Sequence, residues 1–206
     1  MTSRSRSVVG IVLAAGRSQR MGEPKALLEI DGQTFLERAI TTLLSGGCAS
    51  VIVVLPPPES ARTMWEIAES TGARVVENPN PESEPIDSLR IGLDGVPTDA
   101  HAAVVLPVDH PVVRKSTVAA LLDAFESGGS IIVRPVYGDR PGHPIVLGRS
   151  VWGELDEPDL SEGTRTVVRR HAAEIEHVMV EDSGVRANID TPDDYARELQ
   201  KPRCED

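Results

Sequence analysis

Runs of apolar residues alternate with amphipathic segments along most of this chain. Continuous apolar runs are typical of strands buried on both faces of a sheet, and a spacing of three to four residues is typical of helices. The expected strands are residues 8–13, 50–55, 74–76, 102–106, 130–133, 142–148 and 175–180, and the expected helices are residues 34–44, 59–70, 88–93, 117–125, 164–171 and 191–200. Such alternation favours a mostly parallel sheet between helices, so we expect a three-layer α/β/α, Rossmann-like fold.

The length of the chain fits one unit of this kind. Its 206 residues can bury the core of one α/β domain, and we find no linker or repeat. We therefore expect residues 1–206 to form a single domain. Ligands of open parallel sheets bind beyond the carboxyl ends of the strands. The loops that follow Leu13, Leu55 and Leu106 are thus where we expect a site.

The composition disfavours several classes of partner. A net charge of -11 repels phosphate backbones, and aromatic residues make up only 3% of the chain, so we expect no nucleic acid. No apolar stretch reaches the roughly 20 residues of a membrane span. Cys48 and Cys204 lack metal-site spacing, which fits a reducing cytoplasm. Secretion is the alternative, because the N-terminus resembles a signal peptide, although "RSQRMGEPK" is unusual after a cleavage site.

The most informative stretch is "LAAGRSQRMGEPKALLEIDG", residues 13–32. An expected strand ends at Leu13, and the small residues after it let a ligand approach the backbone amides. Arg17, Arg20 and Lys25 then supply donors to an anion, in a chain that is acidic as a whole. The stretch contains neither GxxxxGK[ST] nor GxGxxG, which disfavours an ATPase and a nicotinamide-dependent oxidoreductase.

This stretch resembles the signature loop of the MobA-like nucleotidyltransferases, LAAGxSxRMGxPKxLLxxxG, and is most similar to that of the molybdenum-cofactor cytidylyltransferases. Four later stretches resemble further segments of the same family in the same order: "NPNPESEPIDSLRIGL", "LPVDHP", "GDRPGHPIVLG" and "NIDTPDDY". The resemblance implies the fold of the nucleotide-diphospho-sugar transferases. It also implies Mg²⁺-dependent transfer of a nucleoside monophosphate from an NTP, CTP or GTP, to a small phosphate-bearing acceptor such as molybdopterin, and contact with a molybdoenzyme or its chaperone.

The resemblance also assigns residues. The nucleotide-binding positions it implies are Leu13, Ala14, Ala15, Gly16, Arg17, Ser18, Arg20, Gly22, Lys25, Asn78, Ser88 and Asp109. Arg20, Lys25 and Asp109 would be catalytic, Asp109 and Asp190 would hold Mg²⁺, and His143 and Arg165 would contact the acceptor. This division agrees with the chemistry, because such a transfer needs positioning and charge neutralisation more than a general base.

Several alternatives remain open. Asp190 precedes an expected helix capped by Thr191, so it can also serve only to orient that helix. His143 lies between Gly142 and Pro144 and can be an ordinary turn residue, and Asn78 precedes a proline, a plain turn signal. His110 is assigned no role.

The base and the acceptor are also open. Ala15 favours CTP, because guanylyl relatives usually have LAGG here. The acids Glu84 and Asp87 depart from the family pattern and can displace a loop beside a triphosphate. Ser161 stands where molybdopterin-modifying relatives have an aspartate. The remaining readings are therefore a guanylyl- or sugar-phosphate-type transferase, or a nucleotide- or pterin-binding chaperone without turnover.

Overall fold

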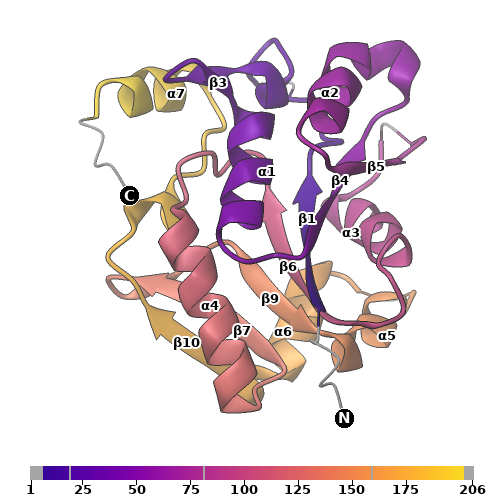
Figure 1. Cartoon of the computed structure of the whole chain (residues 1–206), viewed down its shortest axis with the longest axis vertical. Coiled ribbons are helices and arrows are strands. Elements are labelled where there is room, and N and C mark those ends of the chain that lie inside the picture. Colours follow the sequence, from indigo (N-terminus) through magenta and orange to yellow (C-terminus); the bar gives the residue numbers. More distant parts are fainter. Residues whose placement is uncertain (1–6, 19, 81, 159, 202–206) are drawn as a thin grey trace.

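The computed structural model describes residues 7–18, 20–80, 82–158 and 160–201 (Figure 1). The strands are β1 (Ser7–Leu13), β2 (Glu29–Ile30), β3 (Gln33–Thr34), β4 (Ser50–Leu55), β5 (Arg74–Glu77), β6 (Ala100–Pro107), β7 (Ile132–Tyr137), β8 (Arg140–Pro141), β9 (Ile145–Gly148) and β10 (Ile175–Met179). The helices are α1 (Phe35–Ser45), α2 (Pro58–Ser70), α3 (Pro85–Asp94), α4 (Lys115–Gly128), α5 (Trp152–Leu155), α6 (Thr164–Arg170) and α7 (Pro192–Leu199). Short 3-10 helices occupy Lys25–Leu27, Arg149–Val151, Ala172–Glu174 and Ser183–Arg186. Cys204 lies outside the described residues.

The main sheet has the strand order β10-β7-β9-β6-β1-β4-β5, with β8 paired to β7. The strand β1 lies in the middle and pairs in parallel with β4 and β6, so that Ile11 is opposite Ile52 and Val105. The strand β9 pairs antiparallel with both β6 and β7, whereas β10 is parallel to β7. The expected mostly parallel sheet is confirmed, with β9 inserted in the opposite direction.

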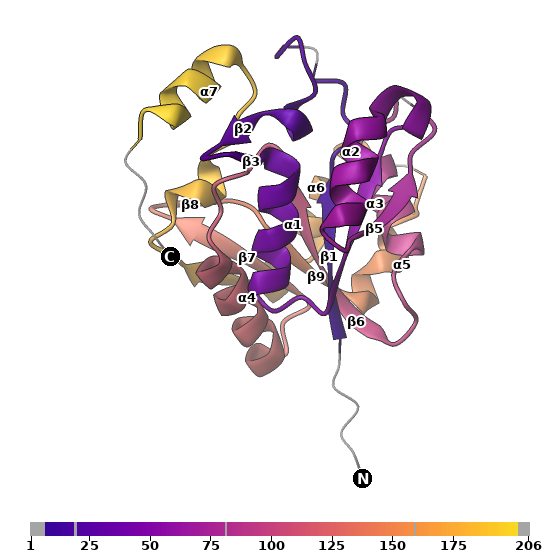
Figure 2. The ribbon, with the colours of Figure 1, turned by 45° about the horizontal axis from the view of Figure 1, so that its top comes forward.

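Helices cover both faces of this sheet, as the view in Figure 2 also shows. Alternate residues of β1 point to opposite faces, so Val12 packs with α1, α2 and α4, whereas Ile11 packs with α3, α5 and α6. A Cβ at Gly92 of α3 would lie 2.8 Å from Ile11 Cγ2, so the absence of a side chain there lets α3 approach β1 closely. The three-layer α/β/α arrangement is confirmed.

Local signals fix the starts of two helices, and the sequence predicts one of them. The Thr191 hydroxyl accepts a hydrogen bond of 3.2 Å from the Asp194 N–H, and the Asp194 carboxylate accepts one of 2.9 Å from the Thr191 N–H. This capping box begins α7 with Pro192 in its first position, as the sequence predicts. Thr34 and Glu37 form the same arrangement at the start of α1.

Two other parts of the structure differ from the sequence-based expectation. The helix expected at residues 88–93 begins at Pro85, because Glu84 and Asp87 form a capping box before it. The hairpin of β2 and β3 is not predicted, although Asp31 and Gly32 at its turn both have positive φ, of 54° and 75°. Asp-Gly is a favoured pair for such turns. No helix within the described ranges is both long and apolar enough to cross a membrane.

Candidate active site

A cleft of about 1680 Å³ opens at the carboxyl ends of the central strands, where the sequence predicts a site. The predicted site residues that line it are Leu13, Ala14, Ala15, Gly16, Arg17, Ser18, Arg20, Lys25, Ser88, Asp109, His143, Arg165 and Asp190. Gly22 and Asn78 are the predicted positions that do not. The fold therefore gathers segments from β1, α3, β6, α6 and the stretch before α7 around one space.

The glycine loop, residues 14–24, follows β1 and leaves the sheet between β4 and β6, the two strands that pair with β1. Val108 donates a backbone hydrogen bond of 3.1 Å to Leu13, and Ala14 donates one of 3.0 Å to Val54. The far end of the loop is held by Ser18, whose hydroxyl accepts a hydrogen bond of 3.0 Å from the Lys25 N–H. A side chain added at Gly16 would meet no protein atom, so the backbone there faces open space into which a ligand can come.

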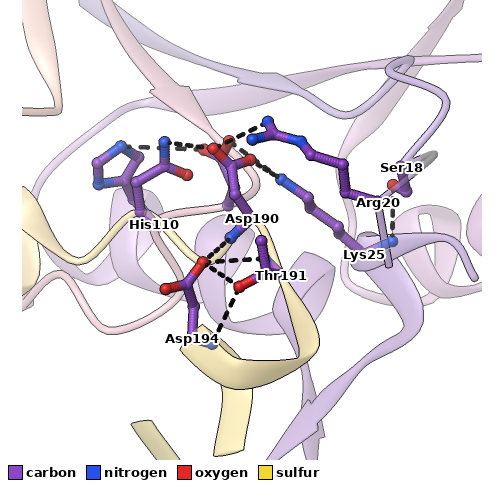
Figure 3. Close-up of polar contacts among 9 residues, drawn as sticks. Ser18, Arg20, Lys25, His110, Asp190, Thr191 and Asp194 are labelled. Carbon is purple, nitrogen blue, oxygen red and sulfur yellow. Dashed lines mark hydrogen bonds and ion pairs between the residues drawn. The ribbon is translucent and has the colours of Figure 1, made fainter. Parts of the chain in front are cut away.

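The Lys25 ammonium lies between two carboxylates from distant parts of the chain (Figure 3). It hydrogen-bonds Asp190 Oδ1 and lies 3.6 Å from Asp109 Oδ2. Arg20 Nη2 lies 3.0 Å from the other oxygen of Asp190. The Lys25 side chain is only 11% exposed, so this contact lies at the floor of the cleft. The four residues predicted to neutralise phosphate or hold metal are thus joined by contacts through Lys25 and Asp190.

Asp190 faces the cleft rather than the helix that follows it. Its carboxylate contacts Lys25 and Arg20 and accepts a hydrogen bond of 3.0 Å from Asn188, whereas the cap of α7 is made by Thr191 and Asp194. Burial raises the pKa of Asp190, but the hydrogen bond and charge of Lys25, together with Arg20, hold it below its ordinary value. The carboxylate is therefore ionised at neutral pH.

The two carboxylates offer a partial coordination set for a divalent ion. Within the described part of the chain, the buried Oδ1 of Asp109 has no hydrogen-bond partner, and His110 Nε2 lies 3.9 Å away, beyond hydrogen-bonding distance. A buried charged oxygen left unpaired is costly unless a ligand completes it. Hard carboxylate oxygens suit Mg²⁺ or Mn²⁺. Since no third His, Cys, Asp or Glu joins them among these residues, water and phosphate oxygens must supply the other ligands.

Two imidazoles continue the cleft beyond Asp109. The rings of His110 and His143 lie 5.0 Å apart. Burial lowers the pKa of His110, and burial, together with the charges of His110, Arg134 and Arg165, lowers the pKa of His143 to about 3. Both rings are therefore neutral at pH 7. His110, to which the sequence assigned no role, lies beside a predicted metal ligand.

Asn78 lies beneath the cleft. Its amide nitrogen donates hydrogen bonds of 2.9 Å to the Ser88 hydroxyl and 2.7 Å to that of Ser83, and its side-chain oxygen accepts one of 3.0 Å from the Asn80 N–H. The polar atoms of Asn78 are thus used in shaping the turn before α3. We expect it to act on a nucleotide only through that turn.

The acids in this segment help to form the start of α3. Asp87 accepts a hydrogen bond of 3.0 Å from the Glu84 N–H and contacts the guanidinium of Arg90 at 3.1 Å. Both its carboxylate oxygens are thereby used to start and brace α3. The helix α3 therefore begins at Pro85, three residues earlier than the sequence predicts.

The cleft also contains basic residues that the sequence analysis did not single out. They are Arg134, Arg140, Arg169 and Arg186. Arg134 has a recognisable signal, because it interrupts the apolar stretch "IIVRPV". A charged residue within a buried strand usually has a specific partner or a ligand. Arg140 is on the short, exposed strand β8, and Arg169 and Arg186 are on helices, where the sequence offers no such signal.

Comparison with known proteins gives a consistent family. A family model described as "MobA-like NTP transferase domain" matches residues 10–175. Nicotine blue oxidoreductase from Paenarthrobacter nicotinovorans is 30% identical over 93% of this chain and 96% of its own length. A 2-C-methyl-D-erythritol 4-phosphate cytidylyltransferase from Rhodococcus jostii is 30% identical over 86% of this chain and 80% of its own. A probable molybdenum cofactor guanylyltransferase from Methanothermobacter thermautotrophicus is 31% identical, over 76% and 78%.

Solved structures agree with the fold. The crystal structure of Rv0371c from Mycobacterium tuberculosis superposes with a TM-score of 0.81 and is 30% identical, covering 98% of this chain and 100% of that one. Rv0371c in complex with manganese gives a TM-score of 0.78 at 28% identity, covering 95% of this chain and 100% of that one. The related protein thus binds the kind of ion that two carboxylates and phosphate oxygens would coordinate.

Proposed function

The chain belongs to the MobA-like NTP transferase family, and from this we propose that it is a Mg²⁺-dependent nucleotidyltransferase. It transfers a nucleoside monophosphate, CMP in preference to GMP, from an NTP to a small phosphate-bearing acceptor such as molybdopterin. The observation that carries the proposal is the contact of one buried ammonium, Lys25, with Asp109 and Asp190 beside the glycine loop. Such a site places cationic and metal-binding groups together where a triphosphate would lie.

The nucleotide would replace the internal ion pairs of the cleft. Lys25 and Arg20 would exchange Asp190 for phosphate oxygens, and the amides of the glycine loop would point at the same oxygens. Asp109 and Asp190 would hold the divalent ion, which supplies neutralisation of phosphate charge when bound. The buried and unpartnered Oδ1 of Asp109 supports this assignment. Lys25 then has the role of stabilising charge that develops on the departing pyrophosphate.

The acceptor reacts without a general base. A phosphate monoester has a second pKa near 6, so at neutral pH it is largely a dianion with an oxygen ready to attack. That oxygen forms a bond to the α-phosphorus while the bond from the α-phosphorus to the bridging oxygen of the β-phosphate breaks. The electron pair leaves with pyrophosphate. His143 supports this scheme, because burial lowers its pKa to about 3, which leaves it too weak a base to accept a proton effectively at pH 7.

The preference for CTP rests on Ala15 and on the likeness to cytidylyltransferases such as the one from Rhodococcus jostii. Guanylyltransferases are matched at similar identity, so GTP is the competing substrate. Ala15 lines the cleft next to Gly16, so its methyl group is within the space that a bound nucleotide would share. We further propose that the protein acts in the cytoplasm as one domain, in keeping with its free, buried Cys48 thiol.

Release of pyrophosphate tests the proposed function. The protein is incubated with Mg²⁺, each of CTP, GTP, UTP and ATP, and either molybdopterin or sugar phosphates as acceptors. We expect release that depends on both CTP and an acceptor. Nucleotide binding without release under any combination would instead indicate a chaperone. A parallel arm measures oxidation of NADH and NADPH, and activity there would favour a function like that of nicotine blue oxidoreductase.

A further inference from the structure

The cations that line the cleft fall into two groups. Around the glycine loop, each cation has a carboxylate partner: Lys25 and Arg20 contact Asp190, and Arg17 contacts Glu82. These ion pairs neutralise the cations around the loop while no phosphate is bound. The arginines further along the cleft are different. Arg134 and Arg186 have no part in the functions described above, and Arg165 has only the acceptor contact that the family resemblance implies.

Arg134, Arg165 and Arg186 line the cleft without an anionic partner in the described part of the chain. The Nε of Arg134 is buried and has no hydrogen-bond acceptor there. Arg134 is partly buried, and leaving a buried N–H of a guanidinium without an acceptor is costly; the same burial lowers the pKa of Arg134. The chain carries 32 acidic residues, so partners are not scarce. An unpaired arginine in this position is therefore a feature that a bound anion would satisfy.

The imidazole of His143 lies within the same group. Its Nδ1 is buried without a hydrogen-bond partner among the described residues. Besides His110, the charged groups that act on His143 are Arg134 and Arg165, whereas those that act on His110 are Asp109, Asp190 and Lys25. The two rings, 5.0 Å apart, thus separate a carboxylate–lysine group from an arginine group.

The strand order gives the spacing between these groups. Asp109 follows β6 and Arg134 is on β7, and β9 lies between these two strands. Neighbouring strands are about 4.8 Å apart, so the strands that carry the two groups are roughly 10 Å apart. A ligand that uses both groups at once needs two anionic groups rather than one.

We propose that Arg134, Arg165 and His143 form a subsite for a second oxyanion of the acceptor, set apart from the phosphate that reacts. The subsite rests on the proposed function only in one respect: the oxyanion that it binds is taken to be part of the acceptor. The guanidinium groups of Arg134 and Arg165 both line the cleft and both act on His143, which favours a doubly charged tetrahedral oxyanion such as a phosphate group over a carboxylate. Neutral His143 can donate one hydrogen bond to it while adding no charge of its own.

The experiment measures binding of inorganic phosphate, which needs no turnover. The full-length chain carries Lys25→Ala throughout, so that the glycine loop lacks its buried ammonium. In this background, calorimetry compares Arg134→Gln with Arg62→Gln, a control at an exposed arginine of α2 whose partner is Glu66. We expect Arg134→Gln to weaken phosphate binding about tenfold or more, as the loss of a charged hydrogen bond does, and Arg62→Gln to leave it unchanged.

Two further measurements keep the result decisive. Phosphate should shift the side-chain ¹⁵N resonances of His143, and Arg134→Gln should abolish that shift. Arg165→Gln changes an exposed residue and so tests the subsite even if Arg134→Gln fails to fold. A phosphate affinity that changes less than twofold in both variants would overturn the proposal, as would an equal loss in Arg62→Gln. Stronger binding of acetate than of phosphate would overturn the assignment to a doubly charged oxyanion.

These results are separable from the proposed function. Phosphate binding that depends on Arg134, in a protein that never releases pyrophosphate, would support the subsite and contradict the proposed transferase activity. If pyrophosphate is released but neither Arg134→Gln nor Arg165→Gln changes phosphate binding, the transferase activity is supported and the subsite is contradicted. In an active enzyme, Arg134→Gln should raise the KM for a doubly anionic acceptor and leave the KM for the nucleotide unchanged.

Discussion

The backbone N–H of Ile189 donates a hydrogen bond of 2.9 Å to the carbonyl oxygen of Asp109. This bond joins the loop after β6 to the segment before α7, two stretches that are far apart in the sequence. It brings Asp109 and Asp190 to the same edge of the sheet, where both carboxylates reach the Lys25 ammonium. The binding of one cation by both carboxylates therefore depends on tertiary structure, and replacing Lys25, Asp109 or Asp190 should have a distinct effect.

Removing the lysine should leave the fold intact and slow transfer. Lys25→Ala deletes one preorganised charge at the floor of the cleft, and such a deletion costs roughly 3 kcal/mol of barrier, or about 100-fold in kcat. Lys25→Arg should restore little, because the bulk and the geometry of the donors differ. Pyrophosphate release and thermal unfolding are measured for both, with Arg62→Gln as control. Turnover near that of the wild type in Lys25→Ala would remove Lys25 from the mechanism.

Replacing either carboxylate should remove metal-dependent turnover. Asp109→Asn and Asp190→Asn each take one charge from the divalent-ion site, so we expect Mn²⁺ binding, followed by calorimetry, to be lost with activity. Without metal, Asp190→Asn should bind NTP at least as tightly as the wild type does, because Lys25 and Arg20 no longer pair with Asp190. If Asp190→Asn keeps its activity and loses only thermal stability, then Asp190 merely orients α7.

The choice of nucleotide can be read from thermal shifts. A ligand that binds only the folded state raises the apparent stability according to its affinity. We expect CTP with Mg²⁺ to raise the melting temperature more than GTP, UTP or ATP does at equal concentration. Ala15→Gly, which recreates the guanylyl-type LAGG, should narrow the difference between CTP and GTP. A larger shift with GTP in the wild-type protein would assign it to the guanylyl branch.

Stability should fall as the pH drops below about 6.5. His143 has a pKa of about 3 in the folded protein against an ordinary value of 6.5, so below pH 6.5 only the unfolded chain binds this proton. Its contribution to stability is therefore present above pH 6.5 and lost progressively toward pH 3. His143→Gln should flatten the dependence of the melting temperature on pH between 7 and 5.

The protonation of His171 changes the stability in the opposite direction, so its contribution has to be separated from that of His143. Hydrogen bonds that the His171 ring donates to Glu174 and Glu154 raise its pKa, so its contribution to stability is present below pH 6.5 and is lost as the pH rises above its raised pKa. His171→Gln is therefore the matched control, and it should steepen the loss of stability toward acid. Identical pH profiles for His143→Gln and the wild-type protein would show that His143 is not held neutral by its surroundings.

The cap of α7 should affect stability and metal binding differently. Thr191→Ala removes the hydroxyl that accepts from Asp194, at a cost of about 1 kcal/mol or roughly 2–4 °C in melting temperature. Thr34→Ala removes the corresponding cap of α1 and should cost about as much. Because Thr191 follows Asp190 directly, only Thr191→Ala should also weaken Mn²⁺ binding. Equal Mn²⁺ affinities in the two variants would show that the cap does not position Asp190.

The sequence alone determined the features that depend on neighbouring residues. Apolar runs fixed the central strands, and helical spacing fixed α1, α2 and α4. Thr191 and Pro192 fixed the start of α7, because capping is a matter of three or four consecutive residues. The glycine loop was placed at the end of β1 for the same reason, since Leu13 ends an apolar run and Gly16 follows it.

Only the tertiary structure decided which distant residues meet. The insertion of β9 between β6 and β7 results from long-range strand pairing, and it places His143 against His110 and Arg134 in the same cleft. No local pattern contains that order, because the free energy of strand pairing comes from contacts across the sheet and not from neighbours in the chain. The contact of Lys25 with Asp190 has the same origin, since residues that are well separated in the sequence approach only after the sheet has formed.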